Sequence, residues 1–401
     1  MFLCALFSKV MAITLPLVMV LYDYVFLEGS CKAPAKKFFP PQITVKDKMI
    51  FFVLAAVFAA IGAAAAVPSF DGNFIASLFK NIYRAVFQYA FYIVKFFLPF
   101  KLSIVYPPAM ESKTLFTILL PFFVLFWSWI NIAAFKKSKK IFFGLMFYTI
   151  TILPVLNIVP FGLEIPADRF TYIPYIGLFY CAANGISLIN SKKSKAAAAA
   201  ALCCIIVFFC FLSRERVNEW KDNITLFTKS IERYPTYIAY ANRGAAYFEA
   251  KEYSLALEDE FKALDAGFSY DAIAHILIAF IYRETGKHEE ALKEVNIGLD
   301  SASYDDAKNA YSLRADIYRS LSEHDKAVED LRHLYDYYEN TNYIFWETAA
   351  IYEEAGKYHL SVLEIEKLLE LEPHNAEAKR HRTKLLNKIA DGDYPIPEDA
   401  A

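Results

Sequence analysis

Six apolar runs of bilayer-spanning length fill the first half of this 401-residue chain. A helix rises about 1.5 Å per residue, so roughly 18–25 apolar residues cross the hydrocarbon core of a membrane. The first half is too apolar to be the core of a water-soluble domain. The sequence therefore predicts a polytopic transmembrane helical bundle over residues 1–213, with full spans near 10–27, 49–67, 115–135, 141–161, 170–189 and 196–212.

The charge balance changes sign where the apolar runs end. Before Ser213 the chain has 19 Lys and Arg against 7 Asp and Glu, a net charge of +12, whereas the remainder has 23 against 37, a net charge of −14. Such asymmetry indicates two domains in different environments. We expect an all-α protein in which a soluble helical domain, residues 214–390, follows the bundle. The six cysteines lack metal-ligand spacing, and we expect no metal and no cofactor.

Lysine-rich loops orient the expected spans. Residues 28–48, 136–140 (KKSKK) and 191–195 (SKKSK) carry most of the basic side chains between the runs, and cytoplasmic loops collect such residues. The segment near 86–100 must then begin and end outside, which favours an interfacial helix over a span. The acidic half follows the last outward span, so we expect it to be extracytoplasmic. We interpret residues 1–8, closed by Lys9, as the end of a helix whose start is missing.

The acidic half repeats itself with a period near 34 residues. A small residue is followed three positions later by Tyr, and about nine positions further on by another small residue. The tyrosines lie 35, 36 and 34 residues apart, and two glycines follow their tyrosines by four positions, where two helices would turn back. The pattern residues are Gly244, Tyr247 and Ala256; Ala279, Tyr282, Gly286 and Ala291; Ala315, Tyr318 and Ala327; Ala349, Tyr352, Gly356 and Ser361; and Pro373, which closes the last unit.

This pattern resembles the tetratricopeptide repeat. The small residues let two antiparallel helices approach each other, and stacked pairs bury faces that one pair alone leaves exposed. We expect an α-solenoid with repeats near 237–270, 272–305, 308–341 and 342–375. A lone helix over 219–235 should precede it, a polar capping helix over 374–389 should follow it, and residues 391–401 should be disordered.

The repeat groove predicts a protein or peptide partner, because most such grooves bind one. Ordinary packing between helices is the alternative for any one groove residue. Asn242 falls where peptide-binding repeats often place an Asn on a ligand backbone. The candidate groove residues are Asn242, Phe248, Phe280, Arg283, Arg319, Tyr343 and Trp346.

Three membrane stretches carry a second resemblance: SKVMAITLPLVMVLYDY (8–24), YIVKFFLPFKLSIVYP (92–107) and ADRFTYIPYIGLF (167–179). With WKDNITLFTKSI (220–231), they resemble the transmembrane and tetratricopeptide-repeat-containing O-mannosyltransferases and their bacterial relatives. The resemblance implies the second half of a type-C glycosyltransferase fold. It also implies a polyprenyl-phosphate-linked sugar as donor and a protein hydroxyl as acceptor. The family's catalytic acid lies in a first outer loop without a counterpart here. We therefore expect one of three cases: the chain is truncated, a partner supplies the missing half, or the protein is no longer a transferase.

A lipid-linked phosphate needs cations near the membrane surface. Arg169 is the first candidate, because a guanidinium binds phosphate oxygens in pairs and stays charged. Lys95 and Lys9 follow, with Asp168 and Asp23 in support, and simple interfacial anchoring is the alternative for each. We expect Arg169 to lower the pKa of the adjacent Asp168, so that Asp168 is a partner of the arginine. Neither Asp168 nor Glu164 is favoured as a catalytic base, and the catalytic residue is unknown.

Two functions follow. The first is a membrane-bound glycosyltransferase-like protein whose repeats hold the acceptor. The second is a non-catalytic, membrane-anchored scaffold whose repeats recruit envelope proteins. Both place the chain in a membrane, which the apolar composition suggests is a bacterial inner membrane, with membrane lipid as a partner and no nucleic acid.

Overall fold

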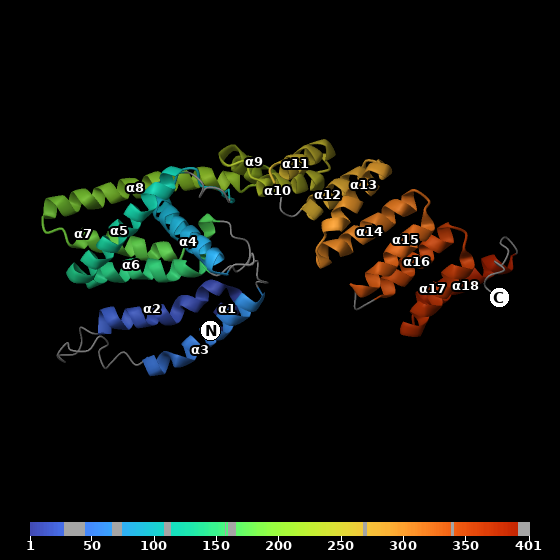
Figure 1. The fold of residues 1–401 in the computed structure, drawn as a ribbon, viewed down its shortest axis with the longest axis horizontal. Coiled ribbons are helices and arrows are strands. Elements are labelled where there is room, and N and C mark those ends of the chain that lie inside the picture. The colour runs from blue at the N-terminus through green and yellow to red at the C-terminus, as the bar shows by residue number, and fades with distance from the viewer. Residues whose placement is uncertain are drawn as a thin grey trace. The chain divides into compact units, whose positions relative to one another are not determined.

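The computed structural model describes residues 1–27, 45–65, 74–107, 114–156, 158, 166–267, 271–337 and 341–391. These residues form helices, turns and irregular segments and contain no strand, which confirms the all-α class for the part described (Figure 1). The chain divides into two compact units, Met1–Pro235 and Thr236–Ala401. We call them the N-unit and the repeat unit, and each is described by itself.

The division between the units lies later in the chain than the expected boundary at 213/214. Helix α8 (Lys192–Glu219) continues through that boundary without a break. Helix α9 (Asn223–Arg233) follows it, with Asp222 as its N-cap: the Asp222 carboxylate accepts from the Thr225 N–H at 2.7 Å. Side chains of α8 and α9 also bind the segment after residue 100, as shown below, and α9 therefore belongs to the N-unit.

The N-unit begins with a broken helical segment. Helix α1 (Phe2–Ser8) ends at Lys9, which has an extended backbone, so residues 2–8 are helical up to the lysine, and their interpretation as the end of a longer helix stays a prediction. A 3₁₀ turn (Val10–Thr14), helix α2 (Leu15–Tyr22) and a π-helical turn (Asp23–Leu27) follow in succession. The expected span over 10–27 is thus helical but made of three pieces. Helix α3 (Val45–Ala65) comes next.

Several expected boundaries in the N-unit are wrong. Helix α4 (Phe74–Phe97) has 24 residues and begins well before the interfacial helix expected near 86. Helix α5 (Thr114–Lys137) is followed by α6 (Lys139–Ile152), which stops short of residue 161 because a 3₁₀ turn containing Pro154 replaces it. Helix α7 (Pro174–Ser187) starts at its proline and not near residue 170.

The crossing of α6 and α7 is very close because both helices carry a glycine there. A Cβ atom built on Gly144 would lie 2.5 Å from the carbonyl oxygen of Gly177, and one built on Gly177 would lie 2.3 Å from that of Gly144. Any side chain at either position would push the backbones apart. The two helices lie side by side in Figure 1.

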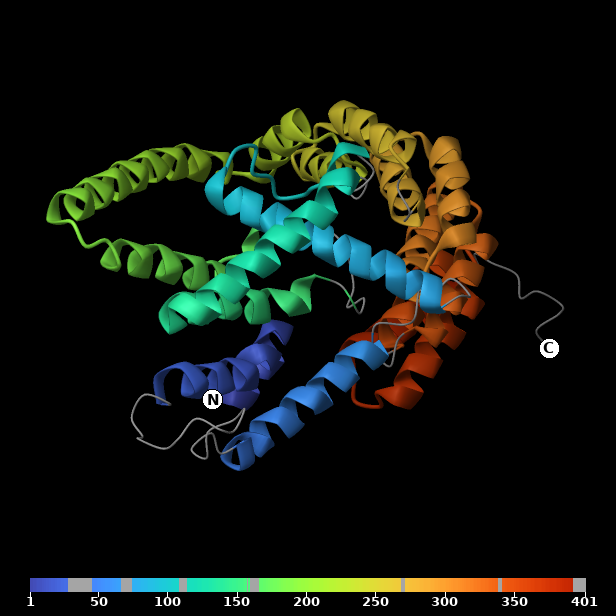
Figure 2. The same ribbon diagram turned by 60° about the vertical axis from the view of Figure 1, so that its left-hand side comes forward.

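Tyrosine hydroxyls attach α4 to this pair. The Tyr148 hydroxyl on α6 donates to the Tyr89 carbonyl at 3.3 Å, and the Tyr175 hydroxyl on α7 donates to the Tyr92 carbonyl at 2.6 Å. Helix α4 also contacts α5, to which it runs obliquely (Figure 2). A core of buried side chains joins the four helices: Ala85, Tyr92, Ile93, Ala134, Leu145, Tyr148, Ile152, Leu156 and Leu178.

Two helices of the described residues are long and apolar enough to cross a membrane, judged by length and composition. They are Leu119–Lys137, within α5, and α8; the apolar segment Met11–Phe26 is shorter. A bundle of six full spans therefore stays a prediction.

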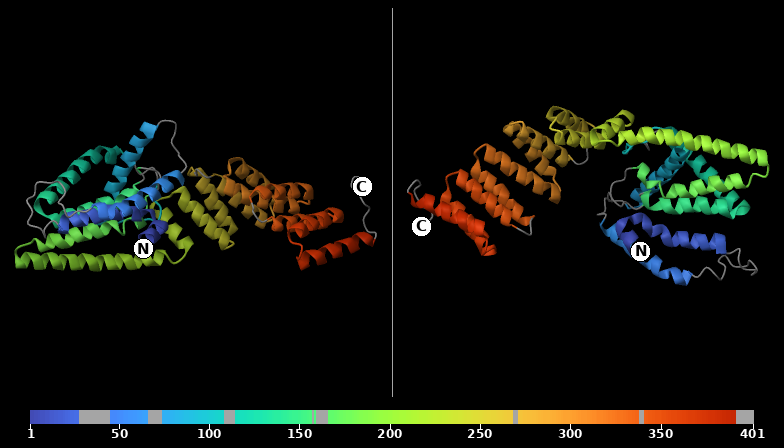
Figure 3. Two further views of the ribbon diagram at one scale, coloured as in Figure 1. Left: turned by 90° about the horizontal axis from the view of Figure 1, so that it is seen from below. Right: turned by 180° about the vertical axis from the view of Figure 1, so that it is seen from behind.

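The repeat unit consists of four antiparallel helix pairs and a final helix. Their bounds are α10 (Tyr237–Glu249) with α11 (Tyr253–Asp265), α12 (Asp271–Glu284) with α13 (His288–Ser301), α14 (Tyr304–Ser320) with α15 (His324–His333), α16 (Asn342–Glu354) with α17 (Tyr358–Leu371), and α18 (Ala376–Ala390). Each pair packs on the next (Figure 3). Helix α14 begins four residues before the expected repeat start at 308, because Ser303 caps it and Asp305 and Asp306 occupy its first turn. Of the expected tail, only Asp391 is described.

The turn inside each pair contains one residue with positive φ. These residues are Lys251, Gly286, Ser322 and Gly356, with φ of 62°, 77°, 61° and 71°. Gly286 and Gly356 therefore occupy the turns where the sequence placed them. Lys251 and Ser322 adopt the same backbone, which costs an L-residue about 1 kcal/mol.

Small side chains fill the contacts between helices as the pattern requires. Ala256, Ala279, Ala291, Ala315, Ala327 and Ala349 are at most 2% exposed. A Cβ on Gly244 would lie 2.3 Å from a carboxylate oxygen of Glu260, so any larger residue would require the Glu260 side chain to move. Ser361 replaces the last alanine and donates its hydroxyl to the Ala349 carbonyl at 2.8 Å. Pro373 lies in the turn between α17 and α18.

An acid at the same place on the second helix of every pair forms a further periodic feature, and it is buried in the first, third and fourth pairs. Asp259 and Asp330 each accept two hydrogen bonds from an arginine 16 residues earlier, Arg243 and Arg314 respectively. In the second pair, Glu294 contacts His275 Nδ1 at 2.6 Å.

The fourth pair lacks the arginine. Its helix has Thr348 in that position, and the Thr348 hydroxyl and one oxygen of Glu364 have no hydrogen-bond partner among the described residues. The buried Arg–Asp pairs thus fasten the first and third repeats only.

We predict that Arg314→Ala destabilises the repeat unit by about 3 kcal/mol, because removing one member of a buried pair leaves the other charge uncompensated. The Asp330 side chain is only 4% exposed. Arg283→Ala is the matched control: Arg283 pairs with Asp316, whose side chain is 51% exposed, and its loss should cost about 0.5 kcal/mol. Hydrogen exchange of α14 and α15 in the full-length chain measures both. Equal protection losses in the two variants would contradict the prediction.

Candidate functional sites

A pocket of about 700 Å³ lies in the N-unit beside the segment that follows α4. Its walls come from α4, residues 99–102, α7, α8 and the end of α9. Most of the lining is apolar and aromatic: Phe96, Pro99, Phe100, Leu102, Tyr175, Phe179, Phe209, Leu212, Val217 and Trp220. Its charged lining residues are Lys95, Lys101, Glu215, Arg216, Glu219 and Arg233. The lining of this apolar cavity therefore has four cations and two acids, and one of the acids, Glu219, pairs with Arg216 and Arg233.

Lys95 is the one sequence-predicted phosphate ligand that lines this pocket. Its ammonium donates to the carbonyl of Phe100 at 2.5 Å and lies 5.4 Å from the ring centre of Phe91 and 5.5 Å from that of Tyr106. These contacts are to carbonyls and rings, and no carboxylate of the described residues bonds directly to Lys95. It is thus a cation that an anionic ligand in the pocket can neutralise.

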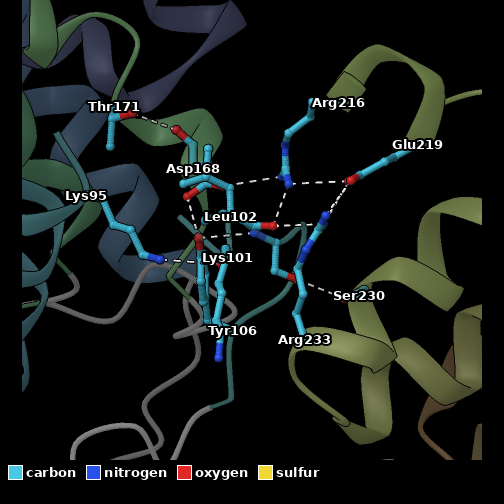
Figure 4. Close-up of polar contacts among 12 residues, drawn as sticks. Lys95, Lys101, Leu102, Tyr106, Asp168, Thr171, Arg216, Glu219, Ser230 and Arg233 are labelled. Atoms are coloured by element: carbon cyan, nitrogen blue, oxygen red, sulfur yellow. Dashed lines mark hydrogen bonds and ion pairs between the residues drawn. The ribbon is translucent and has the colours of Figure 1, made fainter. Parts of the chain in front are cut away.

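Asp168 does not pair with Arg169, which corrects our expectation. The Tyr106 hydroxyl donates to Asp168 at 2.7 Å, and Arg216 lies 3.5 Å from the other carboxylate oxygen (Figure 4). Burial raises the pKa of Asp168 above its usual value, and the hydrogen bond from Tyr106 and the charge of Arg216 only oppose that effect. The expected lowering of the pKa is therefore wrong. Burial likewise raises the pKa of Tyr106, so its phenol keeps its proton.

The same polar network holds residues 101–106 against α8 and α9. The carbonyl of Leu102 accepts from Arg216 and, at 3.0 Å, from Arg233. Arg233 also makes a two-bonded ion pair with Glu219, and the hydroxyls of Ser103 and Ser230 lie 2.9 Å apart. Figure 4 shows these side chains converging on the segment. The network orders one wall of the pocket.

The other predicted phosphate ligands lie outside the pocket lining. Arg169 is exposed and stands over the ring of Phe170, 5.1 Å from its centre. Lys9 lies 5.8 Å from the ring centre of Tyr172, so the fold brings Lys9 to the segment that carries Arg169. Asp23 is at the far end of α2 and pairs with Lys48 on α3, and it supports neither cation. Glu164 lies outside the described residues.

Sequence reasoning missed Arg216, Glu219, Arg233 and Tyr106. Arg216 and Glu219 belong to SRERVNE, a charged run directly after an apolar stretch, and that change of composition was the available signal. Tyr106 lies in a segment quoted for its resemblance to a family, but nothing local marks its hydroxyl as the partner of an acid 62 residues away.

The predicted groove residues of the first two repeats form a mixed surface. The Asn242 amide donates to the Ile238 carbonyl of its own helix at 2.8 Å. The rings of Phe248 and Phe280 are 6.4 Å apart, and the Arg283 guanidinium stands 5.1 Å from the centre of the Phe280 ring. An apolar contact thus runs from the first repeat to the second.

The predicted groove residues of the later repeats are more polar. Arg319 binds Glu354 and lies 3.4 Å from Glu347. Tyr343 is about half exposed, and the Trp346 ring lies 5.6 Å from that of His381 on α18. Aromatic and charged groups therefore share this part of the surface.

The family described as tetratricopeptide repeat matches residues 309–341. This stretch covers most of α14 and all of α15. It shows a tetratricopeptide repeat in the third helix pair, and the other three described pairs have the same helix–turn–helix form. No curated protein sequence matches the chain.

Solved structures of repeat proteins are similar to part of the chain. YrrB, titled a TPR protein with an unusual peptide-binding site, is 15% identical over 42% of this chain and 86% of its own, with a TM-score of 0.35. MamA is 16% identical over 46% and 92%, with a TM-score of 0.34. The C-terminal part of a TPR repeat-containing protein from Cytophaga hutchinsonii is 17% identical over 43% and 69%, with a TM-score of 0.37.

We predict that Arg216→Ala loosens residues 98–106. The variant removes one of two guanidinium donors to Leu102 and the cation beside Asp168, and a charge-assisted hydrogen bond contributes about 1.5 kcal/mol. Amide exchange of this segment should then rise about tenfold. Arg214→Ala, a change of the same kind at an exposed position two residues earlier, is the control. Unchanged exchange in Arg216→Ala would show that Arg233 alone holds the segment.

Proposed function

We propose that the protein is a membrane-anchored scaffold whose tetratricopeptide repeats bind another protein. The observation that carries this proposal is the row of four helix pairs with a mixed aromatic and charged surface on their first helices. Such arrays present extended surfaces on which a partner chain can lie. This is the second of the two functions expected from the sequence.

The exposed apolar surface of the N-unit supports the membrane anchor. No side chain of α8 is buried, although its middle is apolar, and large side chains of α5 are also exposed. In water this surface would cost roughly 25 cal/mol per Å². We propose that lipid covers it. The lysine-rich ends of α5 and α8 then face the cytoplasm of a bacterial inner membrane, and the repeats are extracytoplasmic.

Site-specific photo-crosslinking tests the scaffold function. A benzoylphenylalanine placed at Ala245 or Ser320, on the first helices of the first and third pairs, should crosslink to a partner protein in intact cells. The same residue at Glu258 or Lys293, exposed on second helices, is the control. Crosslinks of equal yield from both sets, or from neither, would count against a scaffold that works through its first helices.

A second candidate function rests on the N-unit pocket. Its apolar walls and four cations suit a molecule with a long apolar chain and an anionic head, because a charge-assisted hydrogen bond is stronger where water is excluded. A transferase that takes its sugar from a polyprenyl-phosphate carrier would need such a site. This candidate moves the donor site from Arg169 to Lys95, Lys101 and Arg216.

Farnesyl phosphate and farnesol, which share the apolar chain and differ in charge, test this candidate. The full-length chain in neutral detergent should bind farnesyl phosphate more tightly, and Lys95→Gln should weaken that binding about tenfold. Arg169→Gln is the matched control and should bind as the unchanged protein does. Weaker binding in Arg169→Gln with no change in Lys95→Gln would place the donor site at Arg169. Equal binding of farnesol would show that the pocket does not recognise the phosphate.

A further inference from the structure

Charged side chains connect the first helices of successive repeats. Arg283 on α12 binds Asp316 on α14 at 2.8 Å, Arg319 on α14 binds Glu354 on α16, and Glu353 on α16 binds Lys388 on α18 at 2.8 Å. Each step joins a charged side chain on the first helix of one pair to an opposite charge on the first helix of the following pair or, in the last step, on α18. We call this series the ladder.

The ladder ends on α18 with more cations than acids. The sequence of α18, AEAKRHRTKLLNKIA, has five Lys and Arg residues against one Glu. Glu353 is shared by Lys388, by His381 at 3.1 Å and by Lys384 at 3.9 Å. One carboxylate cannot neutralise two lysines, and no further repeat of the described residues lies beyond α18 to supply another.

Two cations are well placed for an outside ligand. The Lys384 side chain is 63% exposed, and its nearest carboxylate oxygen already binds Lys388. Arg380, one helical turn earlier, is exposed as well. Arg382 points elsewhere, because it pairs with Glu366 on α17 at 3.7 Å. Arg380 and Lys384, four residues apart, therefore share one side of α18, and the exposed Lys379 lies beside that side.

Aromatic side chains border this charge. The Trp346 ring lies 5.6 Å from the His381 ring, and Tyr343, one helical turn before Trp346 on α16, is 49% exposed. We call Tyr343, Trp346, Arg380, His381 and Lys384 the terminal basic surface. Aromatic rings accept apolar and aromatic side chains, and ammonium and guanidinium groups accept carboxylates. Together they fit a segment that carries both.

The charge of the rest of the unit decides between kinds of anionic partner. Residues 236–401 have 18 Lys and Arg against 33 Asp and Glu, a net charge of −15, although α18 itself is +4. An extended polyanion such as an anionic membrane surface would also face the acidic remainder of the repeat unit, which would repel it. Ala378 and Leu385 of α18 are buried, and Leu386, at 43%, is the one large apolar side chain of this described helix that is exposed, so the helix lacks the broad apolar face that membrane insertion needs. A short acidic segment meets only the cations.

We propose that the terminal basic surface binds an acidic peptide segment of a partner protein, with its carboxylates on Arg380 and Lys384 and an aromatic side chain against Tyr343 and Trp346. This inference rests on the proposed scaffold function and names the chemistry of its partner. The net negative charge of the repeat unit as a whole repels the same segment from the neighbouring repeats, which confines it to this end of the array.

Fluorescence anisotropy of the full-length chain in neutral detergent tests the proposal. The probe is a fluorescein-labelled peptide, Glu-Asp-Glu-Phe-Glu-Asp-Phe-Glu-Asp, and its neutral counterpart has Gln and Asn in place of Glu and Asp. The acidic peptide should bind more tightly, and added salt should weaken its binding. Arg380→Glu combined with Lys384→Glu should weaken it at least about tenfold, because two attractions become repulsions.

Arg382→Glu is the control for each of these charge reversals, since it reverses one charge on the side of the same helix that pairs with Glu366, and it should alter binding less than about twofold. Circular dichroism of each variant checks that the helices remain. Equal binding of the neutral peptide, or equal loss in Arg382→Glu, would overturn the proposal. Displacement of the acidic peptide by phosphatidylglycerol vesicles, with the same dependence on Arg380 and Lys384, would make the surface a lipid site and also overturn it. If the peptide fails to bind while Ala245 and Ser320 still crosslink a protein, only this inference falls and the scaffold function stands.

Discussion

Close contact between consecutive helices is the constraint on which both units depend. In the N-unit, Gly144 and Gly177 let α6 and α7 approach until each Cβ position is filled by the other helix's carbonyl oxygen. In the repeat unit, a glycine or alanine takes the corresponding role in each pair. Small side chains bury little apolar surface, so they contribute little free energy of their own to helix packing. The packing is stabilised instead by dispersion attraction between the two backbones and by the larger side chains around the crossing.

Polar groups buried beside these contacts determine which helices pair. The Tyr148 and Tyr175 hydroxyls each donate a hydrogen bond to one particular carbonyl of α4. Sliding α4 along α6 and α7 would break both bonds and leave the two hydroxyls unpaired. In the repeats, the Arg243–Asp259 and Arg314–Asp330 ion pairs likewise fix how the two helices of a pair are aligned. Glu260 shows the other solution: burial raises its pKa to about 8, so the carboxyl can stay neutral at pH 7 in the space that Gly244 leaves.

The repeats could be predicted from the sequence because their period is local and recurs four times. The same residue types recur at one spacing, and each occurrence tests the others. The limits of α4 and α6 were less predictable. Apolar residues continue past the C-terminal end of each of these helices, so hydropathy marks no boundary there, and Pro154 ends α6 inside an apolar run. The predicted partner of Asp168 was wrong for a different reason. The sequence neighbour Arg169 was the obvious partner, but the fold brings Tyr106 and Arg216 to the carboxylate from 62 and 48 positions away.

Both candidate surfaces lie where a pattern of charge pairing stops. Around residues 101–106, Arg216 and Arg233 are shared among Asp168, Glu219 and a carbonyl, which leaves Lys95 and Lys101 facing an apolar pocket without an acid of their own. On α18, the ladder reaches a helix whose cations outnumber the carboxylates that bind them among the described residues. Charges that pair within the fold are neutralised in place and offer little to a ligand. Charges left over at the end of a pairing pattern keep their field and their hydrogen-bond donors, and these groups are the ones that another molecule can bind.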